Sequence, residues 1–254
     1  MLLSSVFKTF LLREIDASNH AKIKGRPIIL QDEEALNCIF KVLRTGMQWR
    51  EIQSSVSYAT VFRRFQQWTN KDIFRKAYKK ALLTYKRLVP TKYYCIDSSY
   101  IKNRFGQRCV GKNHTDRGRK AIKLSIVTDQ NGVTYSASTL PGNQPDVTSL
   151  SSSLIHMLSS LDSVPLYADR GYDSRHNRTV STTLGLQDRI FRRRTKTCRR
   201  TNAKRIVVEN AFSWLDKYRR LLLFYEQSPQ PLLSFVFIGL GHHLSERFLS
   251  NQIS

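Results

Sequence analysis

The chain has 254 residues, 41% of them hydrophobic, which is enough for a sizeable core and excludes a wholly disordered polypeptide. Its 42 Lys and Arg outnumber its 19 Asp and Glu, and the net charge of +23 indicates a polyanionic partner. The longest apolar run, Leu232 to Leu240, is far shorter than the roughly 20 residues that span a bilayer, so no membrane partner is expected.

The N-terminal sequence and the cysteines indicate an intracellular protein. The mildly apolar start lacks a preceding basic stretch and a small-residue cleavage site, which leaves a secretory signal as the weaker alternative. Four cysteines without a CxxC pair fit a reducing compartment: Cys38, Cys95, Cys109 and Cys198. We expect the cytoplasm or nucleoid in a bacterium, or the nucleus in a eukaryotic or viral host.

Residues 26 to 89 have the periodicity of three helices. Asp32 is expected to cap the first, which is predicted to stop at Gly46, where a glycine favours helix termination. The second is predicted over Ser57 to Trp68 and the third from Asp72 to about Leu88.

The second of these helices is basic on one side. Arg63 and Arg64 fall away from its apolar positions Val61, Phe65 and Trp68. A three-helix unit of this kind resembles helix-turn-helix domains, in which such side chains enter a DNA groove. A plain helical bundle gives the same periodicity, so both interpretations are open at this point.

Short β-type runs follow the helical region. Tyr93 to Asp97 is an apolar run that ends on a carboxylate. Ile122 to Thr128 and Val133 to Thr139 flank the dipeptide Asn131-Gly132, which is a strong hairpin signal. Three strands are therefore predicted, two of them paired antiparallel.

Helices and strands alternate after the hairpin. The predicted elements are a helix from about Asp146 to Leu161, a strand from Val164 to Ala168, a helix near Asp173 to Thr183, a strand from Arg189 to Arg192, and helices over Ala203 to about Phe224 and Pro231 to Ser250. This order predicts an α/β protein with a ribonuclease H-like mixed sheet flanked by helices. We expect a small helical, helix-turn-helix-like DNA-binding domain over residues 1–89 and a ribonuclease H-like catalytic domain over residues 90–254.

Three carboxylates are candidate metal ligands. Asp97 and Asp169 each end a predicted buried strand, and this topology makes the two strands neighbours. Glu209 borders the apolar stripe of the predicted helix Ala203 to Phe224. One aspartate after a strand usually only starts a turn, but two on neighbouring strands of a strongly basic chain favour a metal site. Oxygen ligands favour Mg²⁺ or Mn²⁺, and two such ions can promote in-line displacement at a phosphodiester.

Basic side chains surround these carboxylates. Between Arg189 and Arg205 there are nine Lys or Arg and no acid, a run typical of either a solvated loop or a phosphate path. Arg220, eleven residues after Glu209, is expected on nearly the same face of one continuous helix. Besides Arg63 and Arg64, the candidate DNA contacts are Lys112, Arg119, Lys120, Arg192, Arg193, Arg194, Arg205, Lys217 and Arg220.

Several segments together resemble a known family. They are Tyr94 to Ser98 (YCIDS), Asp116 to Lys123 (DRGRKAIK), Thr128 to Gly132 (TDQNG), Pro141 to Asp146 (PGNQPD), Tyr167 to Ser174 (YADRGYDS) and Val208 to Leu221 (VENAFSWLDKYRRL). In this order they resemble the blocks of DDE transposases of bacterial insertion sequences, in the branch related to Harbinger elements. The segments Gly25 to Pro27, Leu43 to Glu51 and Thr60 to Trp68 resemble the helical domain of that branch, so the resemblance covers nearly the whole chain.

The resemblance implies a mechanism and a partner. It implies Mg²⁺-dependent cleavage at terminal inverted repeats, joining of the 3′ ends to target DNA, and a catalytic triad of Asp97, Asp169 and Glu209. Double-stranded DNA is then the partner, and we expect a homodimer in the active complex. Arg205 precedes Glu209 by four residues, as in related transposases, but Asp216 stands where their lysine lies and Lys217 follows it.

Two rival functions are weighed against this one. A catalytically inactive, transposase-derived DNA-binding protein would have the same fold and charge. A basic RNA-binding or ribosome-associated protein predicts the charge without the paired carboxylates, and the sequence has no RNA-recognition stacking motif. The sequence does not predict a zinc site, because the candidate ligands lack the spacing of one: Cys109, His114, His242 and His243.

Overall fold

The computed structural model describes residues 2–18, 30–192 and 199–249 of the chain, which forms two compact units. The helical unit comprises Met1–Tyr85, Asp216–Leu222 and Gln230–Ser254. The sheet unit comprises Lys86–Leu215 and Leu223–Pro229.

The helical unit contains five α-helices in the part of the chain that the structure describes: α1 (Ser5–Ser18), α2 (Asp32–Thr45), α3 (Tyr58–Asn70), α4 (Ile73–Leu88) and α8 (Pro229–Leu244). Three acidic residues in the first turn of α2 favour the positive end of its helix dipole. Gly46 ends α2 with a φ of 69°, a conformation that glycine adopts without strain. The Ser57 hydroxyl caps α3 by accepting a hydrogen bond from the Ala59 N–H. The three predicted helices are thus confirmed as α2 to α4, whereas α1 was not predicted. Asp32 is not the cap of α2, because Gln31 occupies the capping position and Asp32 is already in the first turn.

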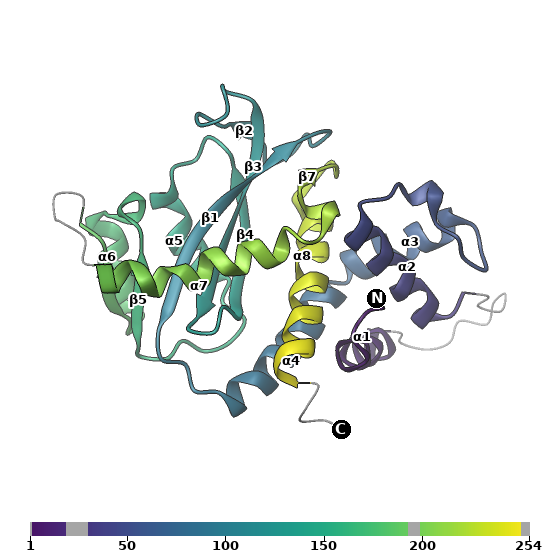
Figure 1. Ribbon diagram of the computed structural model, residues 1–254, viewed down its shortest axis with the longest axis horizontal. Helices are drawn as coiled ribbons and strands as arrows, with labels where there is room; N and C mark the ends of the chain where they lie inside the picture. The colour runs from purple at the N-terminus through teal and green to yellow at the C-terminus, as the bar shows by residue number, and fades with distance from the viewer. Residues whose placement is uncertain (1, 19–29, 193–198, 250–254) are drawn as a thin grey trace. The chain divides into compact units, whose positions relative to one another are not determined.

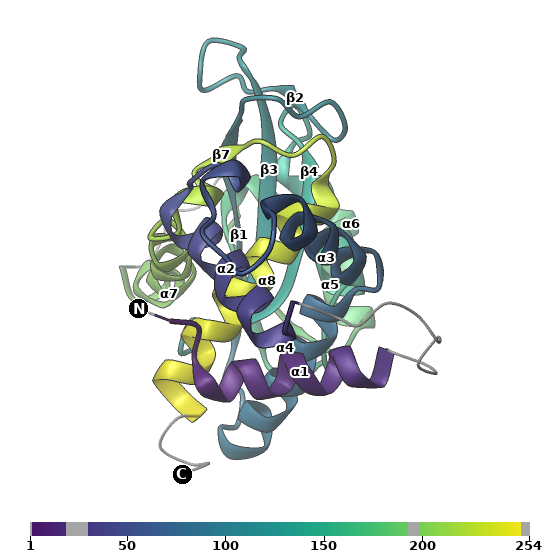
Figure 2. The same ribbon diagram turned by 90° about the vertical axis from the view of Figure 1, so that its right-hand side faces the viewer.

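Aromatic side chains from distant parts of the chain pack together in the helical unit. Phe65 of α3 stacks on Phe235 of α8 with ring centroids 4.6 Å apart, and Trp49 lies 5.2 Å from Phe65. The Tyr218 hydroxyl donates a hydrogen bond to the Gly239 carbonyl at 3.1 Å. Because α8 supplies so much of this core, it groups with the N-terminal helices, and Figure 2 shows it in yellow beside α2 and α3. The helical unit is therefore built from three separate segments of the chain.

The sheet unit contains seven strands: β1 (Tyr94–Asn103), β2 (Gly111–Lys112), β3 (Lys120–Asp129), β4 (Thr134–Pro141), β5 (Pro165–Ala168), β6 (Gln187–Ile190) and β7 (Leu223–Phe224). Apart from the two-residue strands β2 and β7, the strands follow the spatial order β4-β3-β1-β5-β6. β1, β3 and β4 pair antiparallel, whereas β5 and β6 continue from β1 in parallel. This is the ribonuclease H-like arrangement that the sequence predicts. Strand β1 is central in the sheet, because it pairs with β3 on one side and with β5 and β7 on the other.

The turn between β3 and β4 shows why the hairpin signal was strong. Gly132 has a φ of 77°, and the buried Asp129 carboxylate accepts hydrogen bonds from the Asn131 and Val133 N–H groups. The side chain of Asp129 therefore holds the turn while Gly132 supplies the positive φ.

Helices cover both faces of the sheet. On one face, α7 (Arg199–Leu215) crosses β1, and the Cys95 thiol donates to the Lys204 carbonyl at 3.3 Å. On the other face, α5 (Ser149–Ile155) packs on β3, where the Ser125 and Ser153 hydroxyls are 3.0 Å apart. α6 (Arg175–Thr183) follows β5 and packs against β6. Figure 1 shows α7 in front of the strands and α5 behind them.

Several predicted helix boundaries were wrong. The expected helix from Asp146 to Leu161 is a 3₁₀ turn, η2 (Asp146–Thr148), followed by the short α5. The expected helix to Phe224 ends at Leu215, because η4 (Arg219–Leu221) follows and β7 then pairs in parallel with the end of β1. The last predicted helix ends earlier as well, since α8 stops at Leu244 and a π-helix, Ser245–Leu249, continues.

Candidate active site

Two aspartates lie at the same level on neighbouring strands. β1 and β5 pair in parallel with Tyr94 opposite Leu166 and Cys95 opposite Tyr167. Continuing this register by two residues sets Asp97 level with Asp169, which directly follows β5. Asp97 does not end its strand as predicted, because β1 continues its pairing with β3 as far as Lys102. It nevertheless lies just past the last residue of β1 that pairs with β5.

Side-chain alternation turns both aspartates toward α7. Cys95 and Asp97 lie two residues apart and so share one face of β1. Cys95 contacts the Lys204 carbonyl of α7, and Arg205 Nη2 donates to Asp97 Oδ2 at 3.0 Å. The other terminal nitrogen, Arg205 Nη1, is 3.7 Å from Asp169 Oδ2. One guanidinium therefore lies between the two carboxylates.

The remaining carboxylate oxygens accept backbone hydrogen bonds. Asp97 Oδ1 accepts from the Ser98 N–H at 2.8 Å, and Asp169 Oδ1 accepts from the Arg170 N–H. Asp169 thereby caps the 3₁₀ turn η3 (Arg170–Tyr172), so it has the turn-starting role as well as the contact with Arg205. In both residues the Oδ2 atom faces the cation.

Burial shapes the electrostatics of this pair. The side chain of Asp97 is 24% exposed and that of Asp169 is 49% exposed. Burial raises the pKa of Asp97 above its usual value; the Ser98 N–H and Arg205 act in the opposite direction, and Asp169 adds to the increase. Burial also raises the pKa of the neighbouring Cys95 thiol to about 12, which keeps it neutral.

Glu209 lies on the predicted helix, α7. It follows Arg205 by four residues on α7, hence on the same face one turn along the helix. Glu209 is exposed, while Val208, Ala211 and Leu215 form the buried stripe. Among the described residues, no group of three His, Cys, Asp or Glu side chains is close enough to hold a metal ion. The structure thus brings together two of the three predicted ligands.

A polar cluster on the face of the sheet opposite α7 was not predicted from the sequence. Ser98 Oγ donates to Asp146 Oδ1 at 2.6 Å, and Lys123 Nζ donates to the same oxygen at 2.8 Å. Lys123 is only 3% exposed, and the buried Tyr172 hydroxyl is 3.4 Å from Ser98 Oγ. Ser98 follows Asp97, and Tyr172 lies three residues after Asp169, so this cluster anchors the backbone next to both aspartates. Asp146 and Lys123 each end a segment that carries the family resemblance, and this position is the sequence signal that could have indicated a role for them.

The predicted DNA contacts of the sheet unit have different surroundings. Arg205 is 13% exposed and paired with the aspartates rather than free at the surface. Arg193 and Arg194 lie outside the described residues. The exposed candidates are Lys112, Arg119, Lys120 and Arg192. The first three lie on β2, on β3 and in the loop between them, which extends from one end of the sheet in both Figure 1 and Figure 2.

The candidates in the helical unit divide in the same way. Arg63 and Lys217 are exposed. Arg64 forms an ion pair with Asp32 and lies 5.6 Å from the Trp68 ring, so its guanidinium is engaged in contacts within the helical unit. Arg220 is 9% exposed and lies 5.8 Å from the Phe235 ring, inside the helical unit. The prediction that Arg220 continues the helix of Glu209 is wrong, because α7 ends at Leu215 and Arg220 lies in η4.

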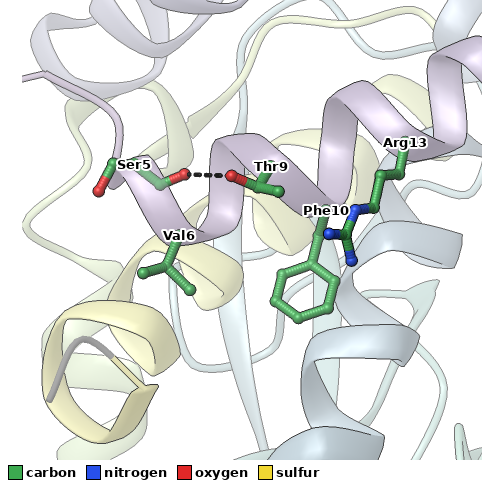
Figure 3. A pocket seen from close by; sticks show the side chains of 5 residues that line it. All are labelled: Ser5, Val6, Thr9, Phe10 and Arg13. Atoms are coloured by element: carbon green, nitrogen blue, oxygen red, sulfur yellow. Dashed lines mark hydrogen bonds between the residues drawn. The ribbon is translucent and has the colours of Figure 1, made fainter. Parts of the chain in front are cut away.

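A surface hollow in the helical unit offers no alternative metal site. It is lined by Ser5, Val6, Thr9, Phe10 and Arg13 of α1, as Figure 3 shows. Thr9 Oγ1 donates to the Ser5 carbonyl at 3.1 Å, within the helix itself. The lining contains one cation and no carboxylate, which is unsuited to a divalent metal ion.

Among the described residues, no helix is both long and apolar enough to cross a membrane.

Two family models match most of the chain. A family model described as "Putative transposase of IS4/5 family" matches residues 11–78, and one described as "Transposase DDE domain" matches residues 90–230. The chain belongs to the DDE transposases. This transposase is 34% identical over 167 residues to a Burkholderia cepacia protein, "Putative transposase for insertion sequence element IS402", across 60% of this chain and 74% of the relative.

A solved structure shares the fold of the transposase. The piggyBac transposase, in a synaptic complex with hairpin DNA, superposes with a TM-score of 0.54 and 10% sequence identity. The match covers 98% of this chain and 74% of the piggyBac chain. At this identity the likeness concerns the fold alone. The family match identifies the protein as a DNA transposase and thus a nucleic-acid-cleaving enzyme.

Proposed function

We propose that the transposase binds the terminal inverted repeats of a mobile element, cleaves the DNA there and joins the ends to target DNA, with Asp97, Asp169 and Glu209 as its catalytic triad. The observation that carries this proposal is the pair of aspartates, level on neighbouring strands, with one cationic group between their Oδ2 atoms. Two carboxylates that converge on a cation are suited to a divalent ion as well, since Mg²⁺ and Mn²⁺ prefer oxygen ligands.

The chain's own residues have distinct parts in this proposal. Asp97 and Asp169 would hold one or two Mg²⁺ or Mn²⁺ ions through their Oδ2 atoms, and Glu209 would complete the ligand set from α7. When bound, such ions activate a water or 3′-hydroxyl and stabilise the leaving oxygen of a phosphodiester. The Ser98 and Arg170 N–H groups fix the other carboxylate oxygens, so each aspartate presents one oxygen to the ion.

Exposed basic side chains would position the DNA. Lys112, Arg119 and Lys120 gather at one end of the sheet, and Arg192 follows β6. Such side chains neutralise phosphates and release counterions. Arg63 on the exposed side of α3 is our candidate for contact with a DNA groove. Specific recognition of the terminal repeats, a homodimeric active complex, an intracellular site of action and the relation to Harbinger elements are parts of the same proposal.

The test compares DNA cleavage and DNA binding in the same variants. The substrate is a duplex carrying the element's own terminal repeats, incubated with Mg²⁺ or Mn²⁺. Asp97→Asn, Asp169→Asn and Glu209→Gln are expected to lose at least about a thousand-fold in nicking and strand transfer, because each removes a charged ligand. Glu51→Gln, which removes an exposed acid of the helical unit, serves as the matched control.

The outcomes separate the enzyme from its inactive descendant. Loss of cleavage in all three variants, with DNA affinity unchanged, supports the triad. If the wild-type protein binds the repeats and cuts them with neither ion, the transposase-derived DNA-binding protein becomes the better description. If only Glu209→Gln remains active, the third ligand must be sought elsewhere on α7.

A further inference from the structure

Arg205 lies between two carboxylates, but not all of its hydrogen-bond donors are satisfied. Its Nη2 hydrogen-bonds Asp97 Oδ2 at 3.0 Å, whereas its Nη1 stays 3.7 Å from Asp169 Oδ2, beyond hydrogen-bond reach. Its buried Nε has no hydrogen-bond partner among the described residues. A guanidinium fits carboxylates best through two parallel hydrogen bonds, and neither aspartate receives such a pair here. The arrangement neutralises the aspartates without satisfying the arginine.

The rest of the surroundings favours release of the arginine. The Phe191 ring lies 5.9 Å from the Arg205 guanidinium and opposes release only weakly, as a cation–π contact at the edge of its range. The buried, unbonded Nε is costly to keep away from water, so movement of the side chain outward recovers solvation. The side chain of Asp169 is half exposed, so this carboxylate is open to exchange with solvent.

We propose that Arg205 is a built-in competitor for the divalent ion: its guanidinium and the ion take the Oδ2 atoms of Asp97 and Asp169 in turn. This inference rests on the proposed function, because it concerns the same two ligands. The competition keeps the buried Asp97 carboxylate neutralised at all times, first by the arginine and then by the ion. By linkage, whatever draws Arg205 away, such as a DNA phosphate, strengthens ion binding by the same factor.

The same step gives Arg205 a second role after displacement. A guanidinium released from the carboxylates keeps its charge and its five donors, which match a phosphate group. DNA and ion would therefore bind cooperatively, and the ion would bind tightly only when a phosphate holds Arg205. Cleavage is thereby linked to the presence of DNA at the aspartates.

The first experiment measures Mn²⁺ affinity without DNA, by counting free Mn²⁺ in electron paramagnetic resonance titrations. Arg205→Gln is expected to bind Mn²⁺ about ten-fold more tightly than the wild type. Arg175→Gln removes an exposed arginine of α6 and should leave the affinity unchanged. Thermal unfolding checks that each variant is folded before titration.

The second experiment uses the wild-type protein and requires no variant. Phenylglyoxal modifies accessible arginines, and mass spectrometry reports the rate at each position. Saturating Mn²⁺ is expected to raise the modification rate of Arg205 several-fold, while that of Arg175 stays constant. A purely structural Arg205, or one that only repels the ion from a fixed position, predicts no increase.

The outcomes distinguish the competitor from the proposed catalytic function. Unchanged or weaker Mn²⁺ binding by Arg205→Gln overturns the competition, as does a tighter affinity without any rise in Arg205 modification. If Asp97→Asn abolishes Mn²⁺ binding in those cases, the proposed ligands still stand. Absence of Mn²⁺ binding by the wild type and by Arg205→Gln alike overturns both.

Discussion

Lys123 is the most deeply buried cation near the aspartates. Its ammonium donates to Asp146 Oδ1 and to the Gln144 carbonyl, each at 2.8 Å, and lies 4.8 Å from the Tyr100 ring. A buried ammonium requires such partners because its desolvation is costly. The partners also fix Ser98 and hence the backbone that follows Asp97.

Replacement of Lys123 by methionine is expected to lower the free energy of unfolding by about 2–3 kcal/mol, because Asp146 loses its charge partner. Urea denaturation measures the change. Lys120→Met, an exposed position on the same strand, should stay within about 0.5 kcal/mol of the wild type. Equal losses in the two variants would show that the pair with Asp146 contributes nothing.

For single residues, the sequence predicted which backbone segments are neighbours but not which side chains are in contact. Asp97 and Asp169 were expected to be neighbours because strand order decides which backbones lie side by side. The contact of Arg205 with both was not predicted, since it depends on the rotation of α7 over the sheet. The cluster of Ser98, Lys123 and Asp146 joins three separate segments, and no local pattern shows such a convergence.

The hairpin between β3 and β4 lies against the helix that carries Arg205. A β-carbon on Gly132 would be 2.9 Å from the Trp214 ring of α7, whereas one on Gly185 would meet nothing within 4 Å. Both glycines have a positive φ, 77° and 78°. They differ in packing rather than in backbone strain.

Gly132→Ala is therefore expected to destabilise the protein by about 2–3 kcal/mol and Gly185→Ala by about 1 kcal/mol. The difference isolates the crowding by the Trp214 ring and the Val207 carbonyl, because both variants bear the same backbone strain. Thermal or urea unfolding of the two variants makes the comparison. Matching losses would mean that the indole moves aside freely.

Helix α8 contains a histidine that is sensitive to pH. Burial, together with the nearby charges of Arg247, Lys217 and His242, lowers the pKa of His243 to about 4. The unfolded chain therefore binds more protons than the folded chain between about pH 6.5 and about pH 4, and stability falls as the pH falls through this window.

We expect the wild type to lose about 1–3 kcal/mol of stability over that window through this group. His243→Gln, which takes up no proton, should flatten that part of the profile. His114→Gln, at an exposed position of the sheet unit, should leave it unchanged. Urea midpoints from pH 4 to pH 7.5 provide the measurement, and a profile that His243→Gln does not alter would refute the assignment.

Element boundaries were predicted best where a local signal fixes them. Gly46 and Ser57 end and begin helices as expected, and the turn at Gly132 is where the sequence placed it. The end of α7 was missed because the apolar spacing continues through Leu221, although that residue is buried in the other unit. β7 is a two-residue strand, too short for any periodicity.

At the scale of the whole molecule, neither unit is contiguous in sequence. The chain passes between the units after Tyr85, Leu215, Leu222 and Pro229. The segment of Tyr218 and the helix α8 return to the helical unit, where Phe235 packs on Phe65.

A fragment of residues 1–85 is accordingly expected not to fold alone, since α8 supplies aromatic groups to its core. Its near-ultraviolet circular dichroism should lack aromatic signals and its unfolding should lack cooperativity. Addition of a peptide of residues 216–249 should restore part of both. Cooperative unfolding of the fragment by itself would contradict this interpretation of the helical unit.

The interrupted path of the chain also bears on how such a protein can evolve. Many proteins gain a new binding specificity when recombination exchanges one uninterrupted stretch of gene for another. Here a crossover near codon 86 would replace α1 to α3 and nearly all of α4, so α8 would have to pack against a new set of side chains. Under the proposed contact of Arg63 with DNA, new DNA specificity would be more accessible through point substitutions at such exposed positions than through the exchange of whole modules.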